Sequence, residues 1–262
     1  MVVTQLREHA FFGISALLFA ASAVMTIAWC TSMSAMGMPM PGGWTMSMAW
    51  MRMPGQTWLS AATSFLGMWA VMMVAMMLPA LVPMLRRYRQ AVDGMGTAHL
   101  GPLTALVGAG YFFVWTALGV AAFPLGVTVA AIEMQQPALA RAVPAAAGTF
   151  IVVAGILQFT AWKARHLACY RELPGHGRTL PADAGTAWRH GLRLGLHCAH
   201  CCANLMVILL VVGVMDVRAM AVVAAAITFE RLAPAGERAA RTIGAVVTGG
   251  GLFLVARAAG LG

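Results

Sequence analysis

Residues 196–215 read LHCAHCCANLMVILLVVGVM, a run of 20 residues that contains no Asp, Glu, Lys or Arg. A transmembrane helix needs about 20 mostly apolar residues to cross roughly 30 Å of hydrocarbon. At a rise of about 1.5 Å per residue, a helix of this length spans that thickness. The stretch therefore predicts a transmembrane helix, with its histidines and cysteines gathered at one end.

The rest of the chain repeats this pattern. Of its 262 residues, 61% are hydrophobic and only 10% are charged, whereas a soluble domain has about 25% charged residues. The composition predicts an all-α, polytopic transmembrane bundle of about seven spans, forming a single domain over residues 1–262 and surrounded by the lipid bilayer. The other six spans are expected at about 10–29, 60–85, 104–131, 143–163, 217–233 and 242–259.

The basic residues predict the orientation of the bundle. The chain carries 17 Lys and Arg residues and a net charge of +9. Lys and Arg collect in cytoplasmic segments of membrane proteins, and most of those found here fall on one side if seven spans alternate. The N-terminus is therefore expected inside and the C-terminus outside. No basic-aromatic RNA motif or zinc-finger spacing is present, so nucleic acid is not an expected partner.

Two connecting segments have distinctive compositions. Residues 30–56 form an expected outer loop rich in methionine, and residues 164–195 form an expected basic cytoplasmic loop with an amphipathic piece from about Trp188 to Leu196. In the last span, Ala245 and Gly249 have the small-xxx-small spacing of a helix-contact surface.

The six residues 197–202 carry the strongest chemical signal. Side chains at positions i, i+3 and i+4 of a helix are neighbours, so this turn can offer thiolates and imidazoles to one ion, although a second helix must complete the shell. Thiolates select Cu(I), zinc or iron–sulfur clusters, and imidazole suits copper and zinc. The alternative is that the cysteines are small apolar packing residues. The candidate ligands are His197, Cys198, His200, Cys201 and Cys202.

A methionine stripe on the second span, in its cytoplasmic half, is the expected source of further ligands, unless these side chains only fill space. Pro79 should bend this span. Glu230, near the inner end of the sixth span, either joins the site or pairs with Arg231 or Lys163. The stripe is Met72, Met73, Met76 and Met77, and the expected supporting residues are Gln158, Lys163 and Asn204.

The outer loop is a second candidate site. Thioethers bind Cu(I) without losing a proton, so this loop can hold the ion weakly, and Cys30 could join it. The alternative is a disordered loop packed on the outer leaflet. The candidates are Met33, Met36, Met38, Met40, Met46 and Met48.

Several motifs together carry a family resemblance. They are Trp69-xx-Met72-Met73-xx-Met76-Met77-x-Pro79, Gln158 with Lys163, the stretch from Gly195 through Cys202 to Met206, and Glu230-Arg231-Leu232. Over about residues 57–250 the chain resembles a bacterial family of uncharacterised, predicted metal-binding integral membrane proteins.

The resemblance implies a multi-pass protein of the bacterial inner membrane with a metal site at Cys198, Cys201 and Cys202, and it implies no established activity. His197 and His200 stand where an aromatic and a small residue are expected, and His166 stands near Cys169 where cysteine is more usual. These changes add nitrogen donors and leave zinc open beside copper.

Three functions are compatible with these residues. The first is copper binding, storage or transfer, with a metallochaperone or membrane subunit as a partner. The second is a membrane metallo-oxidoreductase that uses the same Cys/His/Met cluster. The third is a metal-free assembly subunit, in which the Gly- and Ala-rich spans dock a partner or a second copy of the chain.

Overall fold

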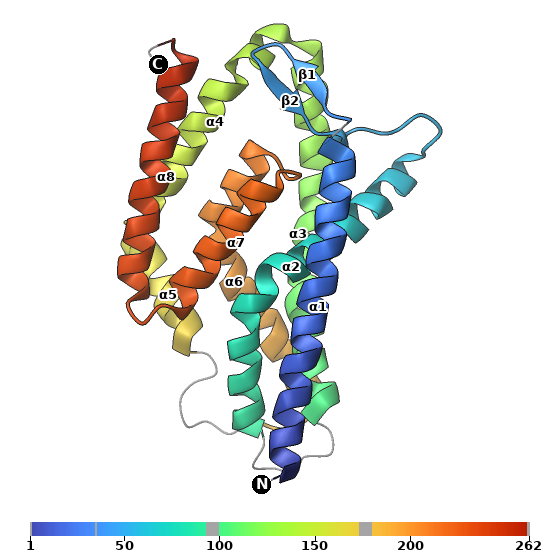
Figure 1. Ribbon diagram of the computed structural model, residues 1–262, viewed down its shortest axis with the longest axis vertical. Helices are drawn as coiled ribbons and strands as arrows, with labels where there is room; N and C mark the ends of the chain where they lie inside the picture. Colours follow the sequence, from blue (N-terminus) through green and yellow to red (C-terminus); the bar gives the residue numbers. More distant parts are fainter. Residues whose placement is uncertain (1, 35, 93–99, 173–179, 261–262) are drawn as a thin grey trace.

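The computed structural model describes residues 2–34, 36–92, 100–172 and 180–260. These residues are mostly helical, as Figure 1 shows, and the only strands among them form one short hairpin. In chain order the elements are α1 (Val2–Ser34), β1 (Met38–Met40), β2 (Trp44–Met46), the 3₁₀ helix η1 (Met48–Trp50), α2 (Trp58–Val92), α3 (Leu100–Gln135), α4 (Pro137–Leu157), α5 (Ala161–Glu172), α6 (Ala184–Val212), α7 (Val217–Leu232) and α8 (Gly236–Ala258).

The all-α expectation is confirmed. Six of the described helices, namely α1, α2, α3, α4, α6 and α8, are long and apolar enough to cross a membrane. The sixth expected span is α7, which has 16 residues and is therefore only about 24 Å long. The two termini lie at opposite ends of the bundle (Figure 1). Seven crossings, with the N-terminus inside, remain a prediction.

Two helix boundaries differ from the sequence expectation, and both affect the site. The expected span 143–163 is interrupted, because α4 ends at Leu157 and α5 begins at Ala161, so Lys163 lies on α5. Helix α6 begins at Ala184, so the amphipathic piece is its first part. Asp183 caps α6 by accepting a hydrogen bond from the Thr186 amide at 2.8 Å. Hydrogen bonds from Thr186 hold the pKa of this carboxyl below its ordinary value.

The methionine-rich outer segment is folded. Strands β1 and β2 form an antiparallel hairpin whose turn contains Gly42 and Gly43, both with positive φ. The Trp44 indole Nε1 donates a hydrogen bond to the Ala140 carbonyl at 2.9 Å, which docks the hairpin on α4. The alternative of a disordered loop therefore does not describe this segment.

Helix α2 bends where the sequence places proline. Pro79 and Pro83 both lie inside it, and Figure 1 shows the helix changing direction near its middle. Each proline lacks the amide hydrogen that would bind the carbonyl four residues earlier, and its ring crowds that carbonyl.

Glycines set the closest helix contacts. On the α3–α6 interface, a Cβ added at Gly110, Gly191 or Gly195 would strike the backbone of the opposite helix. The α4–α8 interface is built in the same way by Gly148, Gly155, Gly244 and Gly251. Ala245 and Gly249 instead lie on the exposed side of α8. The small-residue face that packs against α4 contains Gly244, one position before the expected Ala245.

Candidate metal centre

Helix α6 directs its cysteines into two different surroundings. Cys198 and Cys202 are buried in the main apolar core, together with residues of α2, α3 and α7. Cys201 is also buried, but it packs with Leu167 of α5 and Ala240 of α8. The turn therefore brings two of its three thiols together and points the third toward α5 and α8.

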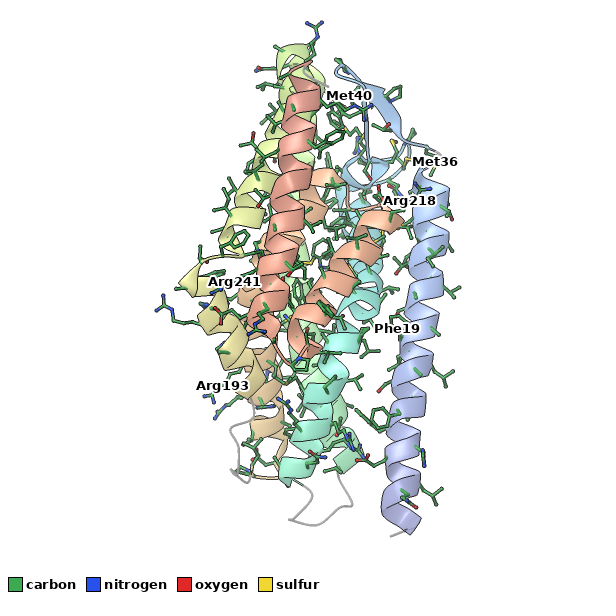
Figure 2. The ribbon with its side chains drawn as sticks, turned by 60° about the vertical axis from the view of Figure 1, so that its left-hand side comes forward. Phe19, Met36, Met40, Arg193, Arg218 and Arg241 are labelled. Carbon is green, nitrogen blue, oxygen red and sulfur yellow. The ribbon has the colours of Figure 1, made fainter. Side chains whose placement is uncertain are left out.

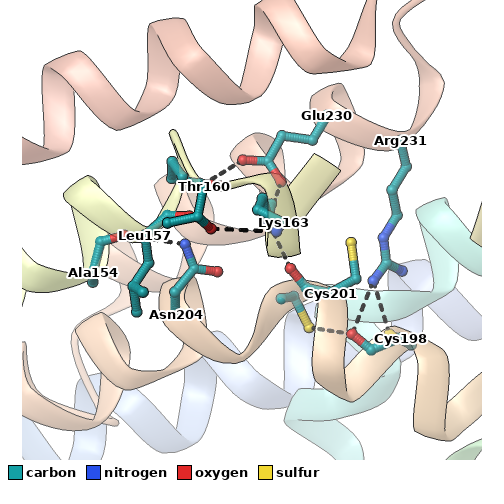
Figure 3. A network of polar contacts seen from close by, with 11 residues as sticks. Ala154, Leu157, Thr160, Lys163, Cys198, Cys201, Asn204, Glu230 and Arg231 are labelled. Carbon is teal, nitrogen blue, oxygen red and sulfur yellow. Dashed lines mark hydrogen bonds and ion pairs between the residues drawn. The ribbon is translucent and has the colours of Figure 1, made fainter. Parts of the chain in front are cut away.

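The sulfur of Cys198 has two polar neighbours. The Tyr111 hydroxyl oxygen lies 2.8 Å from Sγ, and the Arg231 guanidinium Nη2 donates to Sγ at 3.0 Å and to the Cys198 carbonyl at 3.3 Å (Figure 3). The thiol of Cys202, one turn further along α6, donates to the same Cys198 carbonyl at 3.0 Å. A cationic donor beside the sulfur favours the thiolate, which is the form that binds metals.

Close packing of α3 and α6 is what places Tyr111 at this thiol. A Cβ at Gly195 would meet the carbonyl of Tyr111 at 2.9 Å, so only glycine allows this approach. Gly195 precedes Cys198 by almost one helical turn, and the tyrosine ring extends along α6 to the sulfur. Sequence reasoning missed both Tyr111 and Arg231 as neighbours of the thiols, although Arg231 was considered as a partner of Glu230.

The methionine stripe of α2 is fully buried, with Met73 and Met77 completely inaccessible. Met72, Met73, Met76 and Met77 belong to the same contiguous apolar cluster as Cys198 and Cys202. Helices α2 and α6 both pack against α3 and α7, so the thioethers and the two thiols face a common core.

Lys163 and Glu230 form a buried ion pair, as one of the two readings of Glu230 anticipated. Lys163 Nζ lies 2.8 Å from Glu230 Oε2 and donates to the Cys201 carbonyl at 2.6 Å. Gln158 Nε2 donates to the other carboxylate oxygen. Figure 3 shows this network beside the thiols. Both oxygens of Glu230 are thus engaged by α4 and α5.

Asn204 has a packing role on the α4–α6 interface. Its Nδ2 donates to the Ala154 carbonyl at 3.1 Å. Its buried Oδ1 has no hydrogen-bond partner among the described residues. The amide therefore ties α6 to α4, one helical turn from Gln158, and does not contact the sulfur of Cys198.

The histidines of α6 lie away from the thiol pair. The His200 ring is exposed and lies parallel to the ring of His166 on α5, with centroids 5.9 Å apart. His197 is half-buried and close enough to both rings to interact with them electrostatically. The predicted imidazole and thiolate ligands therefore form two groups on opposite sides of one helix.

The outer methionines surround a cavity of about 480 Å³. Its sulfur-bearing wall is formed by Met33, Met36, Met48, Met51, Met53 and Met68. Of the other outer candidates, Met46 is buried in the hairpin, Met38 is exposed, and Met40 lies with Met36 at the hairpin end of the bundle (Figure 2). Cys30 instead lies against Met215, 3.8 Å between their sulfur atoms.

These groups limit the kinds of ion that the chain can hold. Among the residues that the structure describes, no three His, Cys, Asp or Glu side chains are arranged as one metal-binding group. The five predicted Cys and His ligands are therefore not gathered at one point. Thiols and thioethers, which share the apolar core, are soft ligands and favour a soft ion.

One comparison with known proteins gives a match. A family model described as PpoB2, copper chaperone, matches residues 66–254. This range contains the methionine stripe, the three clustered cysteines and the Lys163–Glu230 pair. No curated protein and no solved structure matches the chain. Because the family model covers most of its length, the chain belongs to the PpoB2 copper chaperone family.

Proposed function

We propose that this protein is an integral membrane copper chaperone that carries Cu(I) on the paired thiols of Cys198 and Cys202. The observation that carries the proposal is the pair itself: both thiols are buried, the Cys202 thiol lies on the Cys198 carbonyl one turn away, and the Arg231 guanidinium donates to the Cys198 sulfur. Copper is the cargo of this site, received and passed on by exchange of ligands.

Charge balance favours Cu(I) over zinc at this position. When Cu(I) binds, the two S–H bonds are replaced by two S–Cu bonds and two protons are released. Two thiolates, one monovalent ion and the Arg231 guanidinium then sum to zero charge. A buried site with no net charge avoids the large desolvation cost of an isolated ion. Structural zinc, in contrast, takes four ligands.

The thioethers of α2 suit transfer of the ion. They are neutral and bind Cu(I) without releasing protons, so a methionine can add to the ion before a thiolate leaves. No step then exposes a bare ion to the apolar core. Ligand exchange of this kind requires no change of oxidation state and no nucleotide.

The outer cavity extends this proposal to the opposite end of the bundle. Six thioethers line it, from α1, η1, α2, the segment between η1 and α2, and Met36 just before β1. Met68 belongs both to this wall and to the buried core that holds the thiol pair. We assign the cavity as a weak receiving site for Cu(I), with α2 connecting it to the thiols.

The test measures copper bound to protein purified anaerobically in detergent. We expect about one thiol-bound Cu(I) in the wild type and its loss in Cys198→Ser/Cys202→Ser. Cys30→Ser is the matched control, since that thiol is buried beside Met215 elsewhere, and it should keep the ion. If the double variant retains sulfur-bound copper with unchanged affinity, the assignment is wrong.

The outer cavity is tested separately in liposomes. Replacing Met48, Met51 and Met53 by Leu keeps the apolar volume and removes three thioethers. We expect slower loading of the thiol pair from Cu(I) added outside, with the same final stoichiometry. Unchanged loading kinetics would exclude the cavity as the receiving site.

A further inference from the structure

Two histidines from different helices meet on the surface where α5 packs against α6. His166 of α5 and His200 of α6 have nearly parallel rings, with an interplanar angle of 18° and centroids 5.9 Å apart. The proposed thiol site uses neither ring. His166 also contacts the indole of Trp162, with centroids 4.5 Å apart, which restricts its rotation.

The hydrogen bonds of both rings fix which nitrogen can bind a metal. His166 Nδ1 lies 2.8 Å from the Trp162 carbonyl, and His200 Nδ1 lies 2.8 Å from the Leu196 carbonyl. A carbonyl oxygen only accepts, so each Nδ1 carries the hydrogen and each neutral ring keeps its lone pair on Nε2. Metal-ligating histidines are usually held in this way, by a carbonyl on the other ring nitrogen.

We propose that His166 and His200 form a two-imidazole site for Cu(I), separate from the thiol pair. Two metal–nitrogen bonds of about 2.0 Å each, made through facing Nε2 atoms, would place the ring centres roughly 6 Å apart. The observed centroid separation is 5.9 Å, so the two rings can share an ion by turning their Nε2 atoms toward each other, with the spacing of α5 and α6 unchanged.

This site differs from the thiol pair in ways that suit exchange of the ion with the surroundings. Neutral imidazoles bind Cu(I) without releasing protons, and at the bundle surface the His200 side chain is exposed and the His166 side chain is half-buried. Thiolates are softer and better matched to Cu(I) than imidazole nitrogen. The exposed site is therefore the weaker of the two. The identity of the ion rests on the proposed function, whereas the two-nitrogen geometry does not.

The experiment uses full-length Cys198→Ser/Cys202→Ser protein, in which sulfur binding at the thiol pair is removed. Cu(I) is added anaerobically, and X-ray absorption identifies the donor atoms while titration against a chelator gives the affinity. We expect nitrogen-coordinated Cu(I), with at least tenfold weaker binding after His166→Gln or His200→Gln. His9→Gln, at an exposed position on α1, is the matched control and should change nothing.

The outcomes separate this inference from the proposed function. Sulfur-bound copper of unchanged affinity in the double-serine protein contradicts the thiol site, whereas weak thioether coordination is expected there from the outer cavity. In either case the histidine variants are compared by their nitrogen signal. Copper binding that is unaffected by His166→Gln and His200→Gln overturns the histidine site, whatever happens at the thiols. Equal thermal unfolding of the histidine variants and their parent confirms that the comparison concerns ligands.

Discussion

Replacing either Lys163 or Glu230 alone by a neutral residue should lower the stability of the protein strongly. Replacing both together should lower it less, because no buried charge is then left without its partner. The two side chains are 1% and 2% exposed, and their charged atoms are 2.8 Å apart. Replacing Lys163 by Met keeps the length of the side chain and removes the cation next to the Glu230 carboxylate, which stays buried and hydrogen-bonded to the Gln158 amide. A buried charge that loses its partner is strongly destabilising.

The magnitude follows from the distance. Two unit charges 2.8 Å apart attract by about 6 kcal/mol at an effective dielectric constant of about 20. Breaking a buried pair costs about 3–5 kcal/mol in measured cases, while replacing both partners by neutral groups is close to neutral. We therefore expect Lys163→Met and Glu230→Gln each to cost about 3–5 kcal/mol. The double variant should recover at least about 2 kcal/mol relative to the worse single variant.

The assay is reversible unfolding in mixed micelles of increasing SDS content, followed by tryptophan fluorescence. The control is Arg241→Met, which removes a salt bridge to Glu237 of similar length, 2.7 Å, but with both side chains 60% exposed. Exposed pairs contribute about 0–1 kcal/mol, so this variant should unfold almost as the wild type does. The reasoning would be refuted if Lys163→Met and Arg241→Met lowered the free energy of unfolding equally. It would also be refuted if the loss in the Lys163→Met/Glu230→Gln double variant equalled the sum of the losses in its two single variants.

Two further predictions concern helix packing and the thiol. Gly155→Ala should cost about 1–3 kcal/mol by overpacking, because its Cβ would meet the backbone of α8, whereas Gly249→Ala has open space and should leave the unfolding midpoint unchanged. Arg231→Gln should weaken Cu(I) binding about 10- to 100-fold in chelator competition, since a hydrogen bond to a charged group is worth about 1.5–3 kcal/mol. Wild-type affinity in that variant would show that the guanidinium on Cys198 does not support the ion.

Hydrophobic length was sufficient to find the helices but not their ends. Each expected span corresponds to a helix, because in lipid a run of about 20 apolar residues must form its backbone hydrogen bonds within itself, and a helix does so. The ends were missed where polar residues continue a helix, as α6 does from Ala184 to Leu196. The break between Leu157 and Ala161 was missed because neither proline nor glycine marks it; its residues are Gln158, Phe159 and Thr160. The hairpin at 38–46 was missed because each of its strands has only three residues, which is too short for a strand pattern to be recognised.

The site was predictable where one helix determines it. Spacing alone places Cys198 and Cys202 on adjacent turns, and in the structure the Cys202 thiol contacts the Cys198 carbonyl. Tyr111 and Arg231 come from other helices, and their register depends on how closely α3 and α7 approach α6. Spacing also failed to show that Cys201 is drawn toward α5, where Lys163 binds its carbonyl. A single sequence does not contain these distances.

Rotation along one helix explains why the chain can offer two kinds of copper ligand. Each residue turns by about 100°, so Cys202 lies about 40° from Cys198, while His197 and His200 lie about 100° and 160° away. Leu194, Leu205 and Leu209 are buried with the cysteines, which puts the sulfur in an apolar core that would shield the proposed thiolate-bound ion. The imidazoles on the other side would leave the second proposed site open to exchange. A chaperone requires both retention of a toxic ion and its release to an acceptor, and under our proposal α6 separates these two properties by the direction in which its side chains point.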